Sequence, residues 1–328
     1  MKNSPTIYDV AREAGVSIAT VSRVLNNPHT VNSATLTHVV SVIDKLAYVS
    51  MAQSQAKLAK SARRIGVLIP FFTEPSFTQR LRGIAGVLNQ NNYELVIFPV
   101  DSKDREKSYL QTLPLRRSVD GLIIVSQAFD NEIARRLLGN KMEVVVIEFN
   151  DPRFSTLEID DVNGGSLATR FLLNKGYRRI AFIGGRANPT FGLDPIMKRL
   201  RGYRNTLQAT GLPIREELIY EYALEPGAVL RQLATGGFPL AIFAATDLQA
   251  IAIIKEARSM GLRIPQDVAI IGFDDIDMAH YFGLTTVHQP LDESGRIAAS
   301  LLVSRISDPS QTIQHIELPL TIVERETV

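Results

Sequence analysis

The chain contains no cysteine, which excludes disulfide bonds, thiolate nucleophiles and cysteine-based metal sites. Long apolar stretches are also missing, since no run approaches the roughly 18 residues that a membrane-spanning helix needs. The first residues, MKNSPTIYDV, lack the apolar centre of a secretory signal peptide. We therefore expect a cytoplasmic protein, associated with the nucleoid if it binds DNA, and no membrane partner.

Catalytic sequence motifs are absent as well. The chain has no G-x-S-x-G, no phosphate-binding P-loop, no H-E-x-x-H and no G-x-G-x-x-G after a predicted strand. Its five histidines (His29, His38, His280, His288 and His315) have no metal-ligand spacing. We expect no enzyme, no cofactor and no metal site.

The charge is distributed unevenly over a chain long enough for two or three domains, at 328 residues and 45% hydrophobic. The net charge is +2, but residues 1–64 hold eight basic against three acidic side chains. This gives +5 for the N-terminal part and leaves −3 for the remainder. Such a division is expected when only the N-terminal part meets phosphate.

Residues 6–26, TIYDVAREAGVSIATVSRVLN, predict two short helices joined by a tight turn. Thr6 and Asp9 have the spacing of a capping box, and Ser17 can cap the second helix. Gly15 supplies the left-handed backbone that a helix end prefers. Val21, Val24 and Leu25 point inward together in the second helix.

The outer face of the second helix carries small and hydrogen-bonding side chains. This is the helix-turn-helix pattern, which places such a helix in a DNA major groove. The alternative is an ordinary three-helix cap on a larger domain. The outer residues are Ile18, Ala19, Ser22, Arg23 and Asn26.

A third helix and a linker follow. Leu36, Val39, Val40, Ile43 and Leu46 or Ala47 recur at helical spacing, and Tyr48 ends the headpiece, at about residue 49. Residues 50–64 are alanine-rich and form a helix only marginally in isolation.

Beyond the linker, short apolar runs such as IGVLIP, ELVIFPV, GLIIV and VVVIEF alternate with amphipathic segments, and a second such set follows Asp161. The pattern is typical of parallel βαβ units and predicts two doubly wound lobes. We place lobe 1 at about 65–161 and 290–317, and lobe 2 at about 162–289 and 318–328.

The run IYDVAREAGVSIATVSRVLNN resembles the DNA-binding headpiece of the lactose-repressor (LacI/GalR) family. IGVLIP at 65–70, RLRGY at 199–203, FAATDLQAI at 243–251, IIGFDDI at 270–276 and LTTVHQP at 284–290 resemble further family landmarks, in family order. The resemblance implies a helix-turn-helix headpiece and a periplasmic-binding-protein-like effector domain. It also implies a homodimer on a pseudo-palindromic operator, controlled by a small molecule.

In contact with DNA, hydroxyl and amide side chains are suited to hydrogen bonds with phosphate oxygens. Arg23 can form a bidentate hydrogen bond with guanine, whereas Ile18 and Ala19 have no donors and can only pack against the bases, for instance on thymine methyl groups. The family's linker inserts a leucine into the minor groove. At the usual position this chain has Lys57, and the leucine is Leu58. Our candidate DNA contacts are Tyr8, Ser17, Ile18, Ala19, Thr20, Ser22, Arg23, Asn26, His29 and Leu58.

Strand ends predict a ligand cleft between the lobes. Aromatic rings, carboxylates and one arginine converging there suit a sugar. By resemblance, Arg199 and Asp247 contact its hydroxyls. Alternatively Asp247 and Asp160 cap helices, Arg199 is a surface cation, and Phe72 and Phe149 are core. The candidates are Phe72, Phe77, Asp101, Ser126, Phe149, Asp160, Arg199, Tyr222, Asp247, Phe273, Asp275 and Gln289.

The sequence thus predicts a sequence-specific transcriptional regulator, a repressor, with a sugar effector. One alternative is a solute-binding sugar receptor, whose two lobes look the same. Another is a regulator that responds to a phosphorylated sugar or a nucleobase corepressor, which would need more cationic side chains in the cleft.

Overall fold

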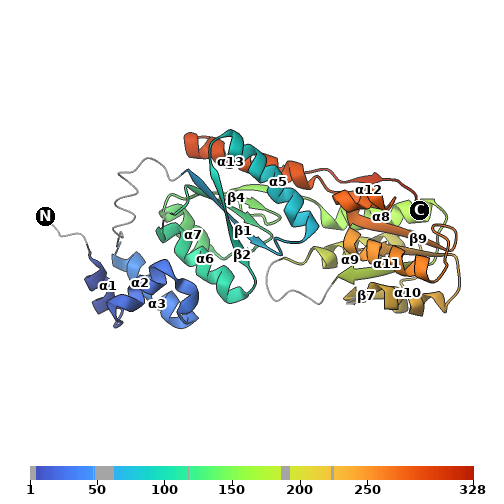
Figure 1. Ribbon diagram of the computed structural model, residues 1–328, viewed down its shortest axis with the longest axis horizontal. Coiled ribbons are helices and arrows are strands. Elements are labelled where there is room, and N and C mark those ends of the chain that lie inside the picture. The colour runs from blue at the N-terminus through green and yellow to red at the C-terminus, as the bar shows by residue number, and fades with distance from the viewer. Residues whose placement is uncertain (1–4, 47, 49–62, 117, 186–192, 223–224) are drawn as a thin grey trace.

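The computed structural model describes residues 5–46, 48, 63–116, 118–185, 193–222 and 225–328. A small helical headpiece is followed by two α/β lobes, and Figure 1 shows the three parts in a row along the long axis. The predicted fold class is confirmed. Within the described ranges, no helix is both long and apolar enough to cross a membrane.

The headpiece has the predicted helix ends. Thr6 accepts a hydrogen bond from the Asp9 backbone while the Asp9 carboxylate accepts one from Thr6, so the capping box is complete. Gly15 has a φ of 62°, and the Ser17 hydroxyl accepts from the backbone of Thr20. The elements are α1 (Ile7–Glu13), α2 (Ile18–Asn26), the 3-10 helix η1 (Pro28–Thr30) and α3 (Ser33–Leu46).

Lobe 1 is built on a six-stranded parallel sheet in the order β11-β5-β4-β3-β1-β2. Its central strand β3 is buried along its whole length, as a continuous apolar run predicts. The strands are β1 (Arg64–Pro70), β2 (Glu94–Val100), β3 (Gly121–Val125), β4 (Glu143–Ile147), β5 (Ser155–Glu158) and β11 (His315–Glu317). The helices are α5 (Pro75–Gln90), α6 (Lys103–Arg116), α7 (Asn131–Gly139) and α13 (Leu291–Ser307).

Lobe 2 repeats this plan with the order β12-β10-β9-β8-β6-β7, in which only β12 is antiparallel to its neighbour. The strands are β6 (Ile180–Gly185), β7 (Ile219–Tyr222), β8 (Leu240–Ala244), β9 (Val268–Asp274), β10 (Thr285–His288) and β12 (Thr321–Val323). The helices are α8 (Asp161–Asn174), α9 (Pro195–Ala209), η2 (Glu216–Leu218), α10 (Pro226–Ala234), α11 (Asp247–Ser259) and α12 (Asp277–Tyr281).

The chain passes between the lobes three times, after β5, after β10 and after β11. In each sheet the parallel strands have their carboxyl ends at the same edge. The residues that follow these strand ends in both lobes therefore lie at the junction between the lobes.

Candidate DNA-binding surface and effector site

The outer face of α2 is open to solvent. Ile18 is 41% exposed and Tyr8, on α1, is 67% exposed, although both are large and apolar or aromatic. Arg23 is held only loosely, by Nε to the Ala19 carbonyl at 3.4 Å and by one NH2 group to the Thr20 hydroxyl at 3.5 Å. Such a side chain is free to reach a base edge.

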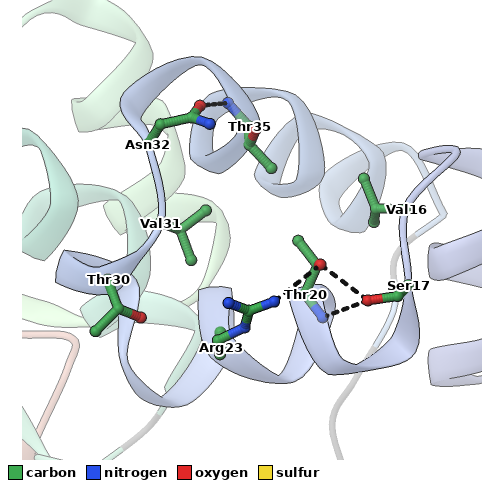
Figure 2. A pocket seen from close by; sticks show the side chains of 8 residues that line it. All are labelled: Val16, Ser17, Thr20, Arg23, Thr30, Val31, Asn32 and Thr35. Atoms are coloured by element: carbon green, nitrogen blue, oxygen red, sulfur yellow. Dashed lines mark hydrogen bonds between the residues drawn. The ribbon is translucent and has the colours of Figure 1, made fainter.

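A hollow of about 490 Å³ lies beside this face. Figure 2 shows Ser17, Thr20 and Arg23 on one side of it and Asn32 and Thr35 on the other. Asn32 accepts a hydrogen bond from the backbone of Thr35 at the start of α3. A helix N-terminus with polar side chains suits a phosphate.

Sequence reasoning did not propose Thr30, Val31, Asn32 or Thr35, which line the same hollow. The Asn-Ser pair before the third helix is an N-cap signal that could have pointed to them. Of the predicted DNA contacts, Leu58 lies outside the described residues, as does Lys57.

Between the lobes, Arg199 of α9 forms the centre of a buried cluster and is only 4% exposed. Its Nε lies 2.9 Å from Asp161, and one NH1 group lies 2.6 Å from the Ala245 carbonyl and 3.4 Å from Asp274. The guanidinium carbon stacks 3.5 Å from the centre of the Phe273 ring. Gln289 donates to the same Asp274 oxygen at 2.6 Å.

A second buried arginine occupies the corresponding place in lobe 1. Arg80 of α5 donates to the Glu148 carboxylate at 2.6 Å and to the Ser294 hydroxyl at 3.0 Å. The hydroxyl of Ser126, at the end of β3, donates to the other Glu148 oxygen. Each lobe therefore presents a buried arginine and at least one carboxylate at the junction.

The two lobes touch across this junction. The Leu193 backbone donates to the Ser126 carbonyl at 3.1 Å. Arg82 of α5 joins Asp277 of lobe 2 at 2.8 Å and Asp292 of lobe 1 at 2.9 Å. The hydrogen bond of Leu193 and the Arg82–Asp277 ion pair join the two lobes.

Comparisons with known proteins identify the architecture. The model of the lacI family of bacterial regulatory proteins matches residues 6–50, and that of a periplasmic binding protein-like domain matches residues 169–328. The ribose operon repressor of Escherichia coli (strain K12) is 32% identical, with 98% of each chain covered. The chain belongs to the lacI family of bacterial regulatory proteins.

Solved structures show the same fold, one of them over nearly the whole chain. A transcriptional regulator CelR–cellobiose complex is similar, with a TM-score of 0.69, 28% identity and coverage of 99% of this chain and 100% of that one. A LacI family transcriptional regulator from Enterococcus faecium with bound ribose is also similar, with a TM-score of 0.69 and 28% identity. The match covers 81% of this chain and 98% of that one. This chain is a LacI-family transcriptional regulator with a helix-turn-helix headpiece and a periplasmic-binding-protein-like effector domain.

The structure brings several predicted ligand residues together in the interlobe cluster, namely Ser126, Arg199, Phe273 and Gln289. Phe77 is half-buried and its ring lies 5.9 Å from the Arg80 guanidinium, with Phe71 beside it. Phe72 is 39% exposed. Nothing is described of the side chains of Tyr222 and His29.

The predicted ligand residue Asp275 does not contact Arg199, whereas its neighbour Asp274 does. The Asp275 carboxylate accepts from Arg325 at 2.7 Å and pairs with His288 at 2.9 Å, whereas Asp274 meets Arg199. Both residues have positive φ, 118° for Asp274 and 55° for Asp275. At this strand end the side chains therefore no longer alternate between the two faces of the sheet. The sequence does not reveal this change in backbone conformation.

Four other predicted ligand residues have different surroundings. Asp101 is exposed and paired with Arg105. Asp160 caps α8 and lines, with Asp161, a hollow formed by residues of both lobes. Phe149 packs edge-on against Phe129 in the lobe 1 core. Asp247 is fully buried and accepts from the Thr286 hydroxyl and the Ile276 backbone, so its contacts hold β10 and the start of α12.

The cluster carries more negative than positive side chains. Burial raises the pKa of Asp274 to about 6 and also raises the pKa values of Asp161 and Asp247. Burial acts on Glu148 in the same direction, but Arg80 and the Ser126 hydroxyl outweigh it, so the pKa of Glu148 is lowered. Sequence reasoning missed Asp274, Asp161, Glu148 and Arg80. Among the described residues, none form a group able to hold a metal ion.

Proposed function

We propose that this repressor responds to a neutral sugar, which binds between the lobes at the Arg199 and Arg80 clusters. The observation that carries the proposal is Arg199, buried against Phe273 with Asp161 and Asp274 as partners. Carboxylates and guanidinium groups bind hydroxyls by charge-assisted hydrogen bonds, and a ring face packs on the C–H groups of a sugar. The bound cellobiose and ribose in the similar structures support this class of ligand.

The charge of the cluster favours a neutral ligand over a phosphorylated one. Three carboxylates (Glu148, Asp161 and Asp274) pair with two buried guanidinium groups (Arg80 and Arg199). Each of these arginines already has a carboxylate partner. A phosphate would meet an excess of negative charge that it could not neutralise.

We further propose that the working unit is a homodimer. The edge strand β2 of lobe 1 presents a half-exposed apolar surface, with Ile97 37% exposed. On lobe 2, Leu248 at the start of α11 and Met278 and Tyr281 along the short adjoining helix α12 are 38%, 41% and 83% exposed. Exposed apolar edges and patches of this kind are usually covered by another chain.

Two copies would place two headpieces on a pseudo-palindromic operator, with half-sites about one helical turn apart. In this proposal residues 1–49 read DNA, 50–64 link, and 65–328 bind the effector and the second copy. Arg23 reads a base, Ile18 and Ala19 pack in the groove, and Tyr8, Ser17, Thr20, Ser22 and Asn26 contact the backbone. A cytoplasmic location follows from this role.

The test uses ribose and cellobiose, each beside a phosphorylated sugar, in a thermal-shift assay on the full chain. A duplex selected by the protein from random DNA then reports operator affinity with and without the stabilising compound. We expect a neutral sugar to raise the melting temperature and to change operator affinity.

Arg199→Met should lose the thermal shift and keep duplex binding, whereas the exposed neighbour variant Lys198→Met should keep both. If the phosphorylated compounds alone stabilise the protein, the neutral-sugar proposal is wrong. A sugar that binds tightly without altering operator affinity contradicts the coupling.

A further inference from the structure

One face of α6 is covered by the headpiece rather than by solvent. Ser108, Gln111, Thr112 and Leu115 recur at three- and four-residue steps and are each at most 4% exposed. Leu115 packs into the headpiece core beside residues of α2 and α3, although it belongs to lobe 1. Figure 1 shows the headpiece lying beside α6 and α7.

The firmest contact between the two parts is an ion pair. Arg136 of α7 donates to one oxygen of Asp44, on α3, from Nε at 3.0 Å and from NH2 at 2.7 Å. The Arg136 side chain is 6% exposed and that of Asp44 is 39% exposed. A weaker contact joins the Gln111 amide to the Thr37 hydroxyl at 3.5 Å.

The covered surface is polar and incompletely hydrogen-bonded. The Ser108 hydroxyl, the Gln111 amide oxygen and one terminal nitrogen of Arg136 are buried and have no hydrogen-bond partner among the residues that the structure describes. Water would satisfy these groups if the surfaces separated, so separation recovers part of the free energy that the contact provides. Interfaces between domains of one chain generally resemble transient protein–protein interfaces in their polarity.

The docked headpiece keeps its DNA-reading face free. Ile18, Ala19 and Arg23 remain exposed while Leu25 and Pro28, at the far end of α2 and in η1, are buried. Docking therefore orients the reading face without blocking it.

We propose that α6 and α7 of lobe 1 form a docking surface for the headpiece of the same chain, closed by the Arg136–Asp44 pair before DNA is met. The headpiece is then oriented by lobe 1 directly and not by the linker alone. α7 begins shortly after Ser126, which belongs to the interlobe cluster. The docking surface and the lobe 1 part of the interlobe cluster thus belong to the same lobe. This inference does not depend on the identity of the effector.

The absence of cysteine makes a distance measurement direct, because two introduced cysteines are the only labelling sites. Ser41→Cys on α3 and Lys107→Cys on α6 are both at exposed positions. With a spin label on each, pulsed electron paramagnetic resonance on the full chain without DNA should give a single narrow distance distribution. A broad distribution in this protein overturns the proposal.

In that background, Arg136→Glu should broaden the distribution, and Arg136→Glu with Asp44→Arg should narrow it again. Arg135→Glu is the matched control, since Arg135 is exposed on the same helix and its hydrogen bond with a described residue is to the carbonyl of Asn131, within α7. It should leave the distribution unchanged. Broadening that the exchanged pair fails to reverse would assign Arg136 to the folding of lobe 1 and overturn the proposal.

A further measurement distinguishes which copy supplies the headpiece. The labelled protein is mixed with a roughly tenfold excess of unlabelled chain, so that after subunit exchange most labelled chains pair with an unlabelled one. An unchanged distance supports docking within one chain. Its loss on dilution would show that the headpiece comes from the second copy, which contradicts the proposal as stated.

Discussion

Arg23 stands on the open face of α2, with only two long contacts to its own helix. A guanidinium that reads guanine contributes roughly 1–3 kcal/mol of discrimination between bases. Arg23→Ala should therefore reduce the free-energy difference between specific and non-specific duplex binding by that amount. Competition binding at fixed salt measures this difference. Arg12→Ala is the control, since Arg12 is exposed and paired with Asp9 on α1. If both variants lost the same amount of discrimination, Arg23 would contribute only its positive charge and would not read a base.

Asp274 gives the interlobe cluster a pH dependence. Burial raises its pKa from 3.8 to about 6, so the folded protein binds this proton more tightly than the unfolded chain does. The wild-type protein therefore loses stability as the pH rises through about 6. Asp274→Asn lacks this loss. Its free energy of unfolding, relative to wild type, should rise by about 1 kcal/mol between about pH 5 and about pH 7.5.

Urea unfolding across that range provides the measurement. Asp267→Asn serves as the control, because its hydrogen bonds with Arg263 lower the pKa of Asp267 to about 2, where titration is complete before pH 5. The control should track wild type with a constant offset. A constant offset for Asp274→Asn as well would show that Asp274 does not titrate in this window.

For single residues, the sequence predicts where a strand ends but not which of the following side chains points into the junction. The apolar runs locate the ends of β3, β4 and β9, and so bring Ser126 and Phe273 to the junction. They do not say which residue after a strand turns inward, because that depends on local φ. Glu148 and Asp274 have φ values of 70° and 118°, and both were missed.

At the scale of elements, glycines set the helix crossings that carry the two buried arginines. A Cβ on Gly202 of α9 would lie 2.0 Å from the Val162 carbonyl oxygen, and one on Gly165 of α8 would lie 2.1 Å from that of Arg199. Lobe 1 repeats this at Gly83 and Gly295, at 1.9 and 2.0 Å from backbone oxygens. The helices can approach this closely only because the side chain is absent.

Gly202→Ala should push α9 away from α8 and displace Arg199 with it. The expected loss is about 3 kcal/mol of unfolding free energy, at the upper end for overpacking. Gly86→Ala, on α5, is the matched control, since nothing lies within 4 Å of a Cβ there. It should be neutral or slightly stabilising in the same denaturant titration. Similar losses in both would remove the crossing as the cause.

The long elements followed from the sequence because their hydrophobic periods are unambiguous. The headpiece caps at Thr6 and Ser17, the buried run of β3 and the amphipathic helices each have a local cause. The short strands β5 and β11 did not, since STLE and HIE lack an apolar run. β5 joins the sheet beside β4, and β11 pairs with β5 only because the chain returns to lobe 1. Such pairing depends on contacts about 160 residues apart, which no local pattern encodes.

For the whole molecule, operator affinity depends on whether two headpieces act together. If the apolar surface of α11 and α12 joins two copies, Tyr281→Arg places a cation in it and should convert the dimer into a monomer in sedimentation velocity. Affinity for a full operator should then fall to that for a half-site. The lobes themselves should keep their stability, because Tyr281 is 83% exposed in the single chain.

Ile313→Arg makes the same chemical change at a 39%-exposed residue in the segment before β11, away from this surface, and should leave the protein dimeric. A Tyr281→Arg protein that remains dimeric would move the interface elsewhere, with the β2 edge at Ile97 as the next surface to test. A monomer that retains full operator affinity has a different consequence. It would mean that one headpiece, oriented by its own lobe 1, supplies the binding free energy without a second copy.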